Sequence, residues 1–155
     1  MDYTRETIKI SITNDDCLEE RVKIANNDLY AHPERRYRYN ININNLTKNF
    51  YIMNGKYVTG IFDSVNFTSE TFFDCTEFRN VVFKNCYFDG IDIRWCKFFN
   101  CHFINCLGEI KYIRVSTFKK DCVFKDTNIK IKYIDQYMYF NSKRYDGYNN
   151  GFVLQ

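Results

Sequence analysis

The sequence has almost no alanine, a single proline and no long apolar run. Ala occurs only twice in the 155 residues, whereas Ile, Lys, Asn, Tyr and Phe are abundant. This usage is typical of an AT-rich genome, such as that of a low-GC bacterium, its phage or a large DNA virus. No window of about 18 apolar residues occurs, so we expect no membrane-spanning helix. Residues 1–11 are rich in charge and lack an apolar stretch, so we expect no signal peptide.

The usual signatures of catalysis and cofactor binding are also missing. The chain has no GxGxxG, Walker or HExxH motif. Nucleophilic catalysis needs a nucleophile, a base and an orienting group, and only His32 and His102 could supply an imidazole base. His32 precedes Pro33 and is expected in a turn. We therefore expect no enzymatic activity and no cofactor.

What the sequence does contain is a bulky apolar residue at every fifth position of its central part. The uninterrupted series is Phe73, Phe78, Phe83, Phe88, Ile93, Phe98 and Phe103. A small or β-branched residue stands two positions before each member, and Asn or Gly often stands two positions after it. Helices repeat every 3.6 residues and strands every 2. A period of five instead indicates two strand-like residues facing the same way, followed by a corner that suits Asn and Gly.

The series extends in both directions with defects. Six-residue steps separate Phe67 from Phe73 and Phe118 from Phe124, and Gly108 stands where a bulky residue is expected. With these irregularities the repeat covers residues 51–134. No other hydrophobic pattern of this strength occurs in the chain, so the repeat is expected to form the core.

Units such as Cys86-Tyr87-Phe88-Asp89-Gly90 and Cys101-His102-Phe103-Ile104-Asn105 resemble those of the pentapeptide-repeat proteins. The resemblance implies an all-β fold, a right-handed quadrilateral β-helix with four pentapeptides per coil and here about four coils. Residues 20 apart would then stack, which places Phe78, Phe98 and Phe118 in one column. Cysteine takes the place of the family's usual alanine.

Five of the seven cysteines occupy that small position of the repeat. They are Cys86, Cys96, Cys101, Cys106 and Cys122. Zinc sites normally show close pairs such as CxxC, and a spacing of five places successive thiols on different faces, with His102 pointing outward. We therefore expect buried, reduced thiols, no metal site and a cytoplasmic protein, in the host cytoplasm if the source is a virus or phage.

The flanks of the repeat are expected to cover the open ends of the solenoid. Residues 1–50 are assigned as an N-terminal cap, with strands around Ile8–Ile12 and Tyr37–Ile43 and a short helix from Asp15 or Asp16 to Leu29. Residues 135–155 are assigned as a C-terminal cap or dimerisation tail, because better-known members of the family dimerise through C-terminal apolar residues.

The distribution of charge along the repeat indicates which class of partner the protein binds. Residues 60–92 hold six acids and two bases, whereas residues 93–132 hold nine bases and three acids. Some pentapeptide-repeat proteins mimic B-DNA and inhibit DNA gyrase, and such a mimic should be acidic along its length, which this chain is not. Nucleic-acid mimicry against an enzyme such as gyrase is therefore the alternative function. The net charge of +3 is too small to predict direct nucleic-acid binding.

Apolar residues at outward positions predict a protein partner. Trp95, Phe99 and Ile104 stand where the repeat normally places polar residues, and Arg94 and Lys97 flank them. Exposed aromatic side chains often mark interaction sites. We therefore expect a non-enzymatic protein-binding module, such as a small inhibitor or decoy, with these five residues as candidates for contact. The competing hypothesis is that a terminal cap covers them.

Overall fold

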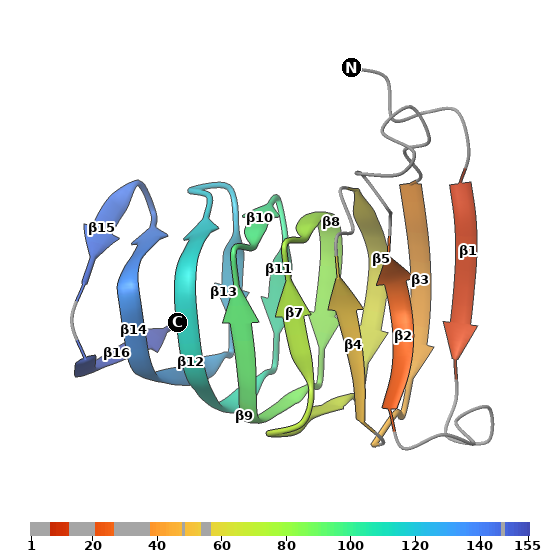
Figure 1. Ribbon diagram of the computed structural model, residues 1–155, viewed down its shortest axis with the longest axis horizontal. Coiled ribbons are helices and arrows are strands. Elements are labelled where there is room, and N and C mark those ends of the chain that lie inside the picture. Colours follow the sequence, from red (N-terminus) through yellow and green to blue (C-terminus); the bar gives the residue numbers. More distant parts are fainter. Residues whose placement is uncertain (1–6, 13–20, 27–37, 48, 54–56, 147) are drawn as a thin grey trace.

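The protein is a parallel β-solenoid of about five turns (Figure 1). The computed structural model describes residues 7–12, 21–26, 38–47, 49–53, 57–146 and 148–155. These residues contain sixteen strands, all in one sheet, and no helix. None of the described segments therefore provides a helix that could cross a membrane.

Each full turn of the chain contributes strand segments to four columns, and each segment pairs in parallel with those of the turns before and after it. The first column holds β1 (Thr7–Ile12), β3 (Arg38–Asn44), β5 (Val58–Asp63), the second half of β8 (Glu77–Lys84), β11 (His102–Ile104) and β13 (Val123–Lys125). The second column holds β2 (Arg21–Asn26), β4 (Asn49–Met53), β7 (Phe72–Asp74), the second half of β9 (Tyr87–Arg94) and the middle of both β12 (Leu107–Phe118) and β14 (Asn128–Phe140). The third holds β6 (Asn66–Phe67) and the starts of β9, β12 and β14. The fourth holds the start of β8, β10 (Lys97–Phe99) and the ends of β12 and β14.

The bulky residues of the five-residue period fill the interior, as the sequence predicts. Phe98 lies between Phe78 and Phe118, with ring centroids 4.9 and 4.4 Å away. Phe83 stacks on Phe103 at 4.5 Å with nearly parallel rings. All five rings are buried. Such aromatic pairs contribute about 0.5–1.5 kcal/mol each beyond the burial of their area, so the stacked rings hold successive turns in register.

Left-handed backbone at the corners explains the recurring asparagines. Asn80, Asn85, Asn100 and Asn105 have φ between 48° and 55°, a region that asparagine tolerates better than most residues. Their side chains also bond between turns. The Asn100 amide donates to Asn80 at 2.6 Å, and the Asn105 amide donates to Asn85 at 2.7 Å.

Gly108 interrupts the bulky series because the backbone there comes too close to its neighbour. Its φ is +119°, and a Cβ at this position would lie 2.0 Å from the carbonyl oxygen of Phe88. No side chain fits that space. The missing bulky residue is therefore a requirement of the backbone path and not a failure of the repeat.

The two six-residue steps place their extra residue in a corner turn. The Thr71 amide donates to the Thr68 carbonyl at 3.0 Å, and the Cys122 amide donates to the Lys119 carbonyl at 3.0 Å. The next bulky residue returns to its column, since Phe73 pairs with Ile52 and Phe124 stacks on Phe103 at 4.8 Å.

The helix predicted between Asp15 or Asp16 and Leu29 is wrong where the structure describes it. Residues 21–26 form β2, which pairs in parallel with β4; the rest of the predicted helix lies outside the described residues. Its segment Arg-Val-Lys-Ile alternates charged and β-branched residues, a period of two that favours a strand. The predicted strands are confirmed as β1 and β3, with Tyr37 outside the described residues. Because β1 and β3 continue the first column in parallel, the solenoid has about five turns instead of about four.

The last turn is joined by two strands that run the other way. β15 (Lys143–Tyr145) and β16 (Tyr148–Leu154) both pair with β14 in antiparallel orientation. Leu154 is buried opposite Ile129, and the Phe152 ring lies 5.3 Å from that of Phe140. These strands therefore cover part of the edge that β14 would otherwise present.

Candidate interaction face

Trp95 stands at the corner between the second and fourth columns. Its φ is 55°, and 52% of its surface is exposed. In the other turns this corner holds Cys75, Val115 or Gln136, so Trp95 is its one large ring among the described residues. Half of the residue's surface is therefore accessible among the described parts of the chain.

Phe99 is packed between two cations on the fourth column. The Arg79 guanidinium lies 4.0 Å from its ring centroid, and the Lys119 ammonium lies 5.5 Å away. Arg79 is correspondingly only partly exposed. Its guanidinium also contacts the Tyr57 ring at 5.2 Å and donates to Glu77 at 3.1 Å. Phe99 thus already has partners within the fold.

The five candidates from the sequence do not form a single patch. Ile104 lies on the first column and is partly buried, whereas Phe99 and the exposed Lys97 lie on the fourth. Only Arg94, at the end of β9, adjoins Trp95 in the chain.

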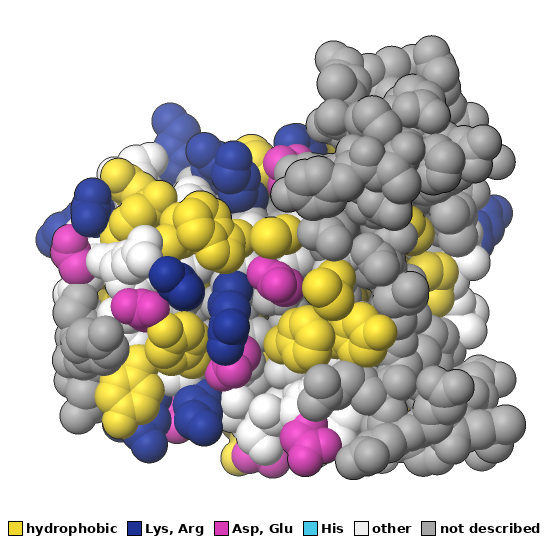
Figure 2. Space-filling view, viewed as in Figure 1, with side chains coloured by type: hydrophobic (Ala, Val, Ile, Leu, Met, Phe, Trp, Pro, Cys, Tyr) yellow, Lys and Arg dark blue, Asp and Glu magenta, His cyan; other side chains and the backbone are white. Residues whose placement is uncertain are grey.

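Two regular rows of side chains cover the outward side of the second column, and we call these ten residues the front face. The first row, in order of pairing, is Tyr51, Phe72, Asp92, Tyr112 and Tyr133. The second row is Met53, Asp74, Arg94, Arg114 and Asp135. Arg94 is exposed and the other nine are partly exposed. Figure 2 shows this side of the molecule, where hydrophobic side chains alternate with acidic and basic ones.

Aromatic stacking orders the first row. The rings of Tyr51 and Phe72 lie 5.1 Å apart and are tilted by only 11°. Asp92 interrupts the rings, and the Arg94 guanidinium lies 5.6 Å from the centroid of the next ring, Tyr112. The row therefore presents four rings and one carboxylate on successive turns of the solenoid, about 4.8 Å per turn.

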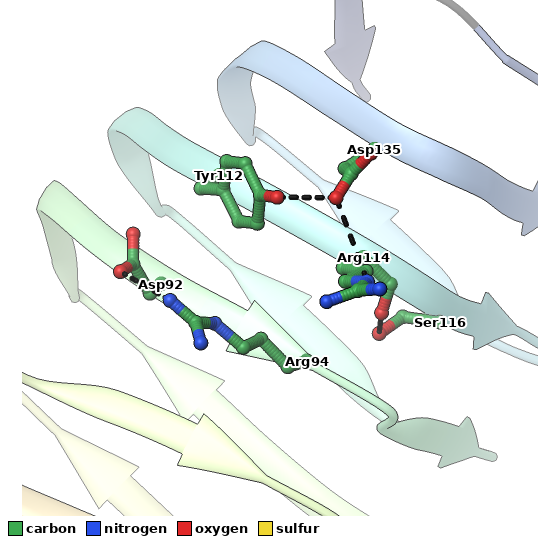
Figure 3. Close-up of polar contacts among 6 residues, drawn as sticks. All are labelled: Asp92, Arg94, Tyr112, Arg114, Ser116 and Asp135. Atoms are coloured by element: carbon green, nitrogen blue, oxygen red, sulfur yellow. Dashed lines mark hydrogen bonds and ion pairs between the residues drawn. The ribbon is translucent and has the colours of Figure 1, made fainter.

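Polar contacts order the second row across three successive turns (Figure 3). Arg94 pairs with Asp92 at 3.6 Å, and Arg114 pairs with Asp135 at 3.5 Å. The Tyr112 hydroxyl donates to the Asp135 carboxylate. This hydrogen bond raises the pKa of Tyr112 above its ordinary value, so the phenol stays protonated. The side chains are thus held in place before any partner arrives.

A cavity of about 310 Å³ opens in the front face between β4, β7 and β9. Met53, Phe72, Asp74, Asp92 and Arg94 line it. Partial burial raises the pKa of Asp92 above its ordinary value, while the nearby charges of Arg94 and Lys111 oppose that shift. The cavity therefore combines an apolar wall with two carboxylates in a partly desolvated setting.

Of the front face, only Arg94 was predicted from the sequence, although the sequence contains a signal for the other nine residues. All ten of its residues flank bulky residues of the second column, which are Ile52, Phe73, Ile93, Ile113 and Ile134. Reading the residue before each of these, at steps of 20 or 21, gives the first row directly. Read along the chain, the same residues are scattered among polar positions.

The cysteine positions agree with the predicted interior. Cys86, Cys96, Cys101 and Cys106 are buried and form no disulfide, and Cys122 is partly buried. Within the described residues, no cluster of three or more potential metal ligands occurs. His102 lies at an outward position of β11, as predicted, and His32 lies outside the described residues.

Comparison with known protein families, curated proteins and solved structures finds no match to this chain. The front face must therefore be interpreted from its own chemistry.

Proposed function

We propose that the chain is a pentapeptide-repeat protein that acts as a non-enzymatic protein-binding module. The five-residue period, the four columns and the left-handed corners support the family assignment and, with it, a right-handed coil. A small inhibitor or decoy of a macromolecular complex is the role that suits such a rigid module.

The composition of the front face carries the proposal. Protein interfaces are enriched in Tyr, Trp, Phe and Arg, and their binding energy concentrates in such residues. The front face presents four aromatic rings and two arginines, with the exposed Trp95 at its border. Because stacking and ion pairs already order these side chains, a partner would bind them with little loss of conformational entropy.

The charges of the front face favour protein binding over mimicry of a duplex. A nucleic-acid mimic needs a row of uncompensated acids, whereas Asp92 and Asp135 are paired with Arg94 and Arg114. Inhibition of a DNA-handling enzyme such as gyrase by charge mimicry remains the alternative. The variants described in the next paragraph leave the net charge unchanged, so binding by charge mimicry should be retained in both of them.

Affinity capture with matched variants tests the proposal. Trp95→Asn keeps a residue that tolerates the corner backbone, and Tyr87→Asn is the control because Tyr87 is equally exposed, at 52%, but lies on the third column. The tagged proteins are incubated with lysate of the source host, and bound proteins are quantified by mass spectrometry. A partner of the front face should be retained by wild type and Tyr87→Asn and fall by about 30-fold with Trp95→Asn, as for a hot-spot residue.

Thermal unfolding of both variants shows whether the fold is intact. Equal capture by wild type and Trp95→Asn, with both folded, would contradict the proposal. A lower melting temperature for Trp95→Asn with unchanged capture would assign the ring to stability and not to binding.

A further inference from the structure

We propose that a second cavity, on the fourth column, binds a phosphate group. Its volume is about 330 Å³, and Lys97, Thr117, Lys119, Tyr139 and Ser142 line it together with the buried Phe118. These residues belong to a different column from the front face. The inference therefore goes beyond the proposed function and does not depend on it.

The register between turns brings these side chains together. Lys97, Thr117 and Tyr139 are successive members of one row on β10, β12 and β14, so they leave the sheet about 4.8 Å apart. Lys119 follows the end of β12, and Ser142 stands in the two-residue turn between β14 and β15, where its φ is 66°. Three turns of the solenoid therefore contribute to one cavity.

The described residues that line the cavity carry two ammonium groups and no carboxylate. In the described part of the chain, neither Lys97 nor Lys119 forms an ion pair. Lys119 lies 5.5 Å from the centroid of Phe99, but contact with a neutral ring leaves the ammonium with its full charge. A concave site lined by charges of one sign concentrates the opposite ion, and a phosphate dianion would balance these two charges.

Acids close to the two lysines in the sheet or in the chain have other partners. Glu77, which precedes Lys97 in the row, accepts a hydrogen bond from Arg79 at 3.1 Å. The Asp121 carboxylate accepts one from the backbone amide of Asn100 at 2.8 Å. Because an acid continues the row, the row does not form the basic groove that follows a nucleic-acid backbone. The cavity is suited to a single anionic group.

Three hydroxyl groups favour phosphate over a carboxylate. Among the described residues, the hydroxyls of Thr117, Tyr139 and Ser142 have no hydrogen-bond partner. The Tyr139 ring packs edge-on against Tyr137 at 5.4 Å, a contact that does not use its hydroxyl. A phosphate group carries close to two negative charges and three strongly accepting oxygens, whereas a carboxylate has one charge and two oxygens. Two ammoniums and three hydroxyls therefore match the phosphate group better.

NMR titration of the full-length, ¹⁵N-labelled chain with inorganic phosphate, at constant ionic strength, tests the inference. The expected result is saturable shifts of the amides of residues 97, 117–119 and 139–142, with a Kd on the order of millimolar, as one small ion provides. Acetate should bind at least about five-fold more weakly. Glycerol phosphate distinguishes two sources of the group: tighter binding than inorganic phosphate would identify a phosphorylated small molecule as the ligand, and weaker binding would identify the free ion.

Lys97→Gln should weaken binding of inorganic phosphate by at least about five-fold, because it removes one charge-assisted donor. Lys130→Gln is the matched control, since Lys130 is an exposed lysine of the third column and its loss changes the net charge equally. Lys97 is exposed, so its variant should keep the melting temperature of the wild type; if it does not, Lys119→Gln provides the same test. Absence of saturable shifts, equal binding of acetate, or equal effects of the lysine variant and its control would overturn the inference.

Discussion

Single residues at the small position of the repeat do more than leave space for the rings. In one stack of three turns, Thr76, Cys96 and Ser116 each donate their side-chain hydrogen to the carbonyl two residues earlier, at 2.9, 3.3 and 2.9 Å. Hydroxyl and thiol therefore serve the same purpose, and cysteine acts here as a small, weak hydrogen-bond donor. The abundance of cysteine in the repeat needs no metal or disulfide to explain it.

The buried thiols are predicted to be unreactive in the native protein. Burial raises the pKa of Cys96 and of Cys101, and the hydrogen bond with Cys106 together with burial raises that of Cys86. Little thiolate, the reactive form, is then present at neutral pH. Reaction with a thiol reagent, followed by peptide mapping, should label the exposed Cys75 rapidly and these three only after unfolding.

A Cys75→Ser variant provides the control for this measurement, because its rapid phase should shrink while the slow sites are unchanged. Rapid labelling of Cys86, Cys96 or Cys101 without denaturant would show that the interior opens far more readily than the packing implies.

Among the elements, β12 has a tight constraint on its backbone. It runs through the third, second and fourth columns in one strand and pairs with β9 on one side and β14 on the other. Gly108 near its start lets the chain approach Phe88 where no Cβ fits. The strand therefore depends on one residue that carries no side chain.

We predict that Gly108→Ala destabilises the protein far more than Gly90→Ala. Both glycines have positive φ, but a Cβ at Gly90 would meet its nearest atom, on Ser69, at 3.4 Å, against 2.0 Å at Gly108. The free energy of unfolding should fall by about 1–2 kcal/mol for Gly90→Ala, from backbone strain alone. The fall for Gly108→Ala should exceed about 4 kcal/mol. Urea unfolding followed by circular dichroism measures both, and equal losses would refute the close approach of β12 to β9.

At the scale of the whole molecule, the sequence predicts the interior much better than the surface. Phe98 and Phe103 could be placed because the five-residue period alone determines which side chains point inward and which column each one joins. Outward neighbours such as Asp92 and Tyr112 depend on the register between turns, which shifts around Lys111. The partial burial of Arg79 likewise depends on rings from two other turns.

The first turns of the solenoid could not be predicted from the five-residue period either. β1, β2 and β3 pair with the later strands but carry no five-residue repeat, so their sequence resembles that of isolated strands or a helix. The propensities of these three segments do not distinguish strand from helix. Parallel pairing with the edges of the central turns therefore determines that they form strands.

Removal of β15 and β16 is predicted to make the protein self-associate. A chain ending at residue 142 would expose the edge of β14 together with Ile129 and Phe140, which Leu154 and Phe152 now contact. Unpaired strand edges beside apolar residues promote pairing between molecules. Sizing chromatography with light scattering should show concentration-dependent dimers or larger species.

Arg144→Ala is the control for the truncation, since Arg144 is an exposed residue of β15 and its loss leaves both strands in place. A truncated chain that remains monomeric and folded would show that the two antiparallel strands do not protect the end of the solenoid.

The corner turns at residues 68–71 and 119–122 have a consequence for how such a chain can evolve. Each absorbs one additional residue while Phe73 and Phe124 keep their places in the interior. Insertions and deletions at these corners alter the surface and spare the core, so length can drift there without a loss of foldability. Selection can thus lengthen a corner into a loop and give the solenoid a new contact, while its stacked turns stay the same.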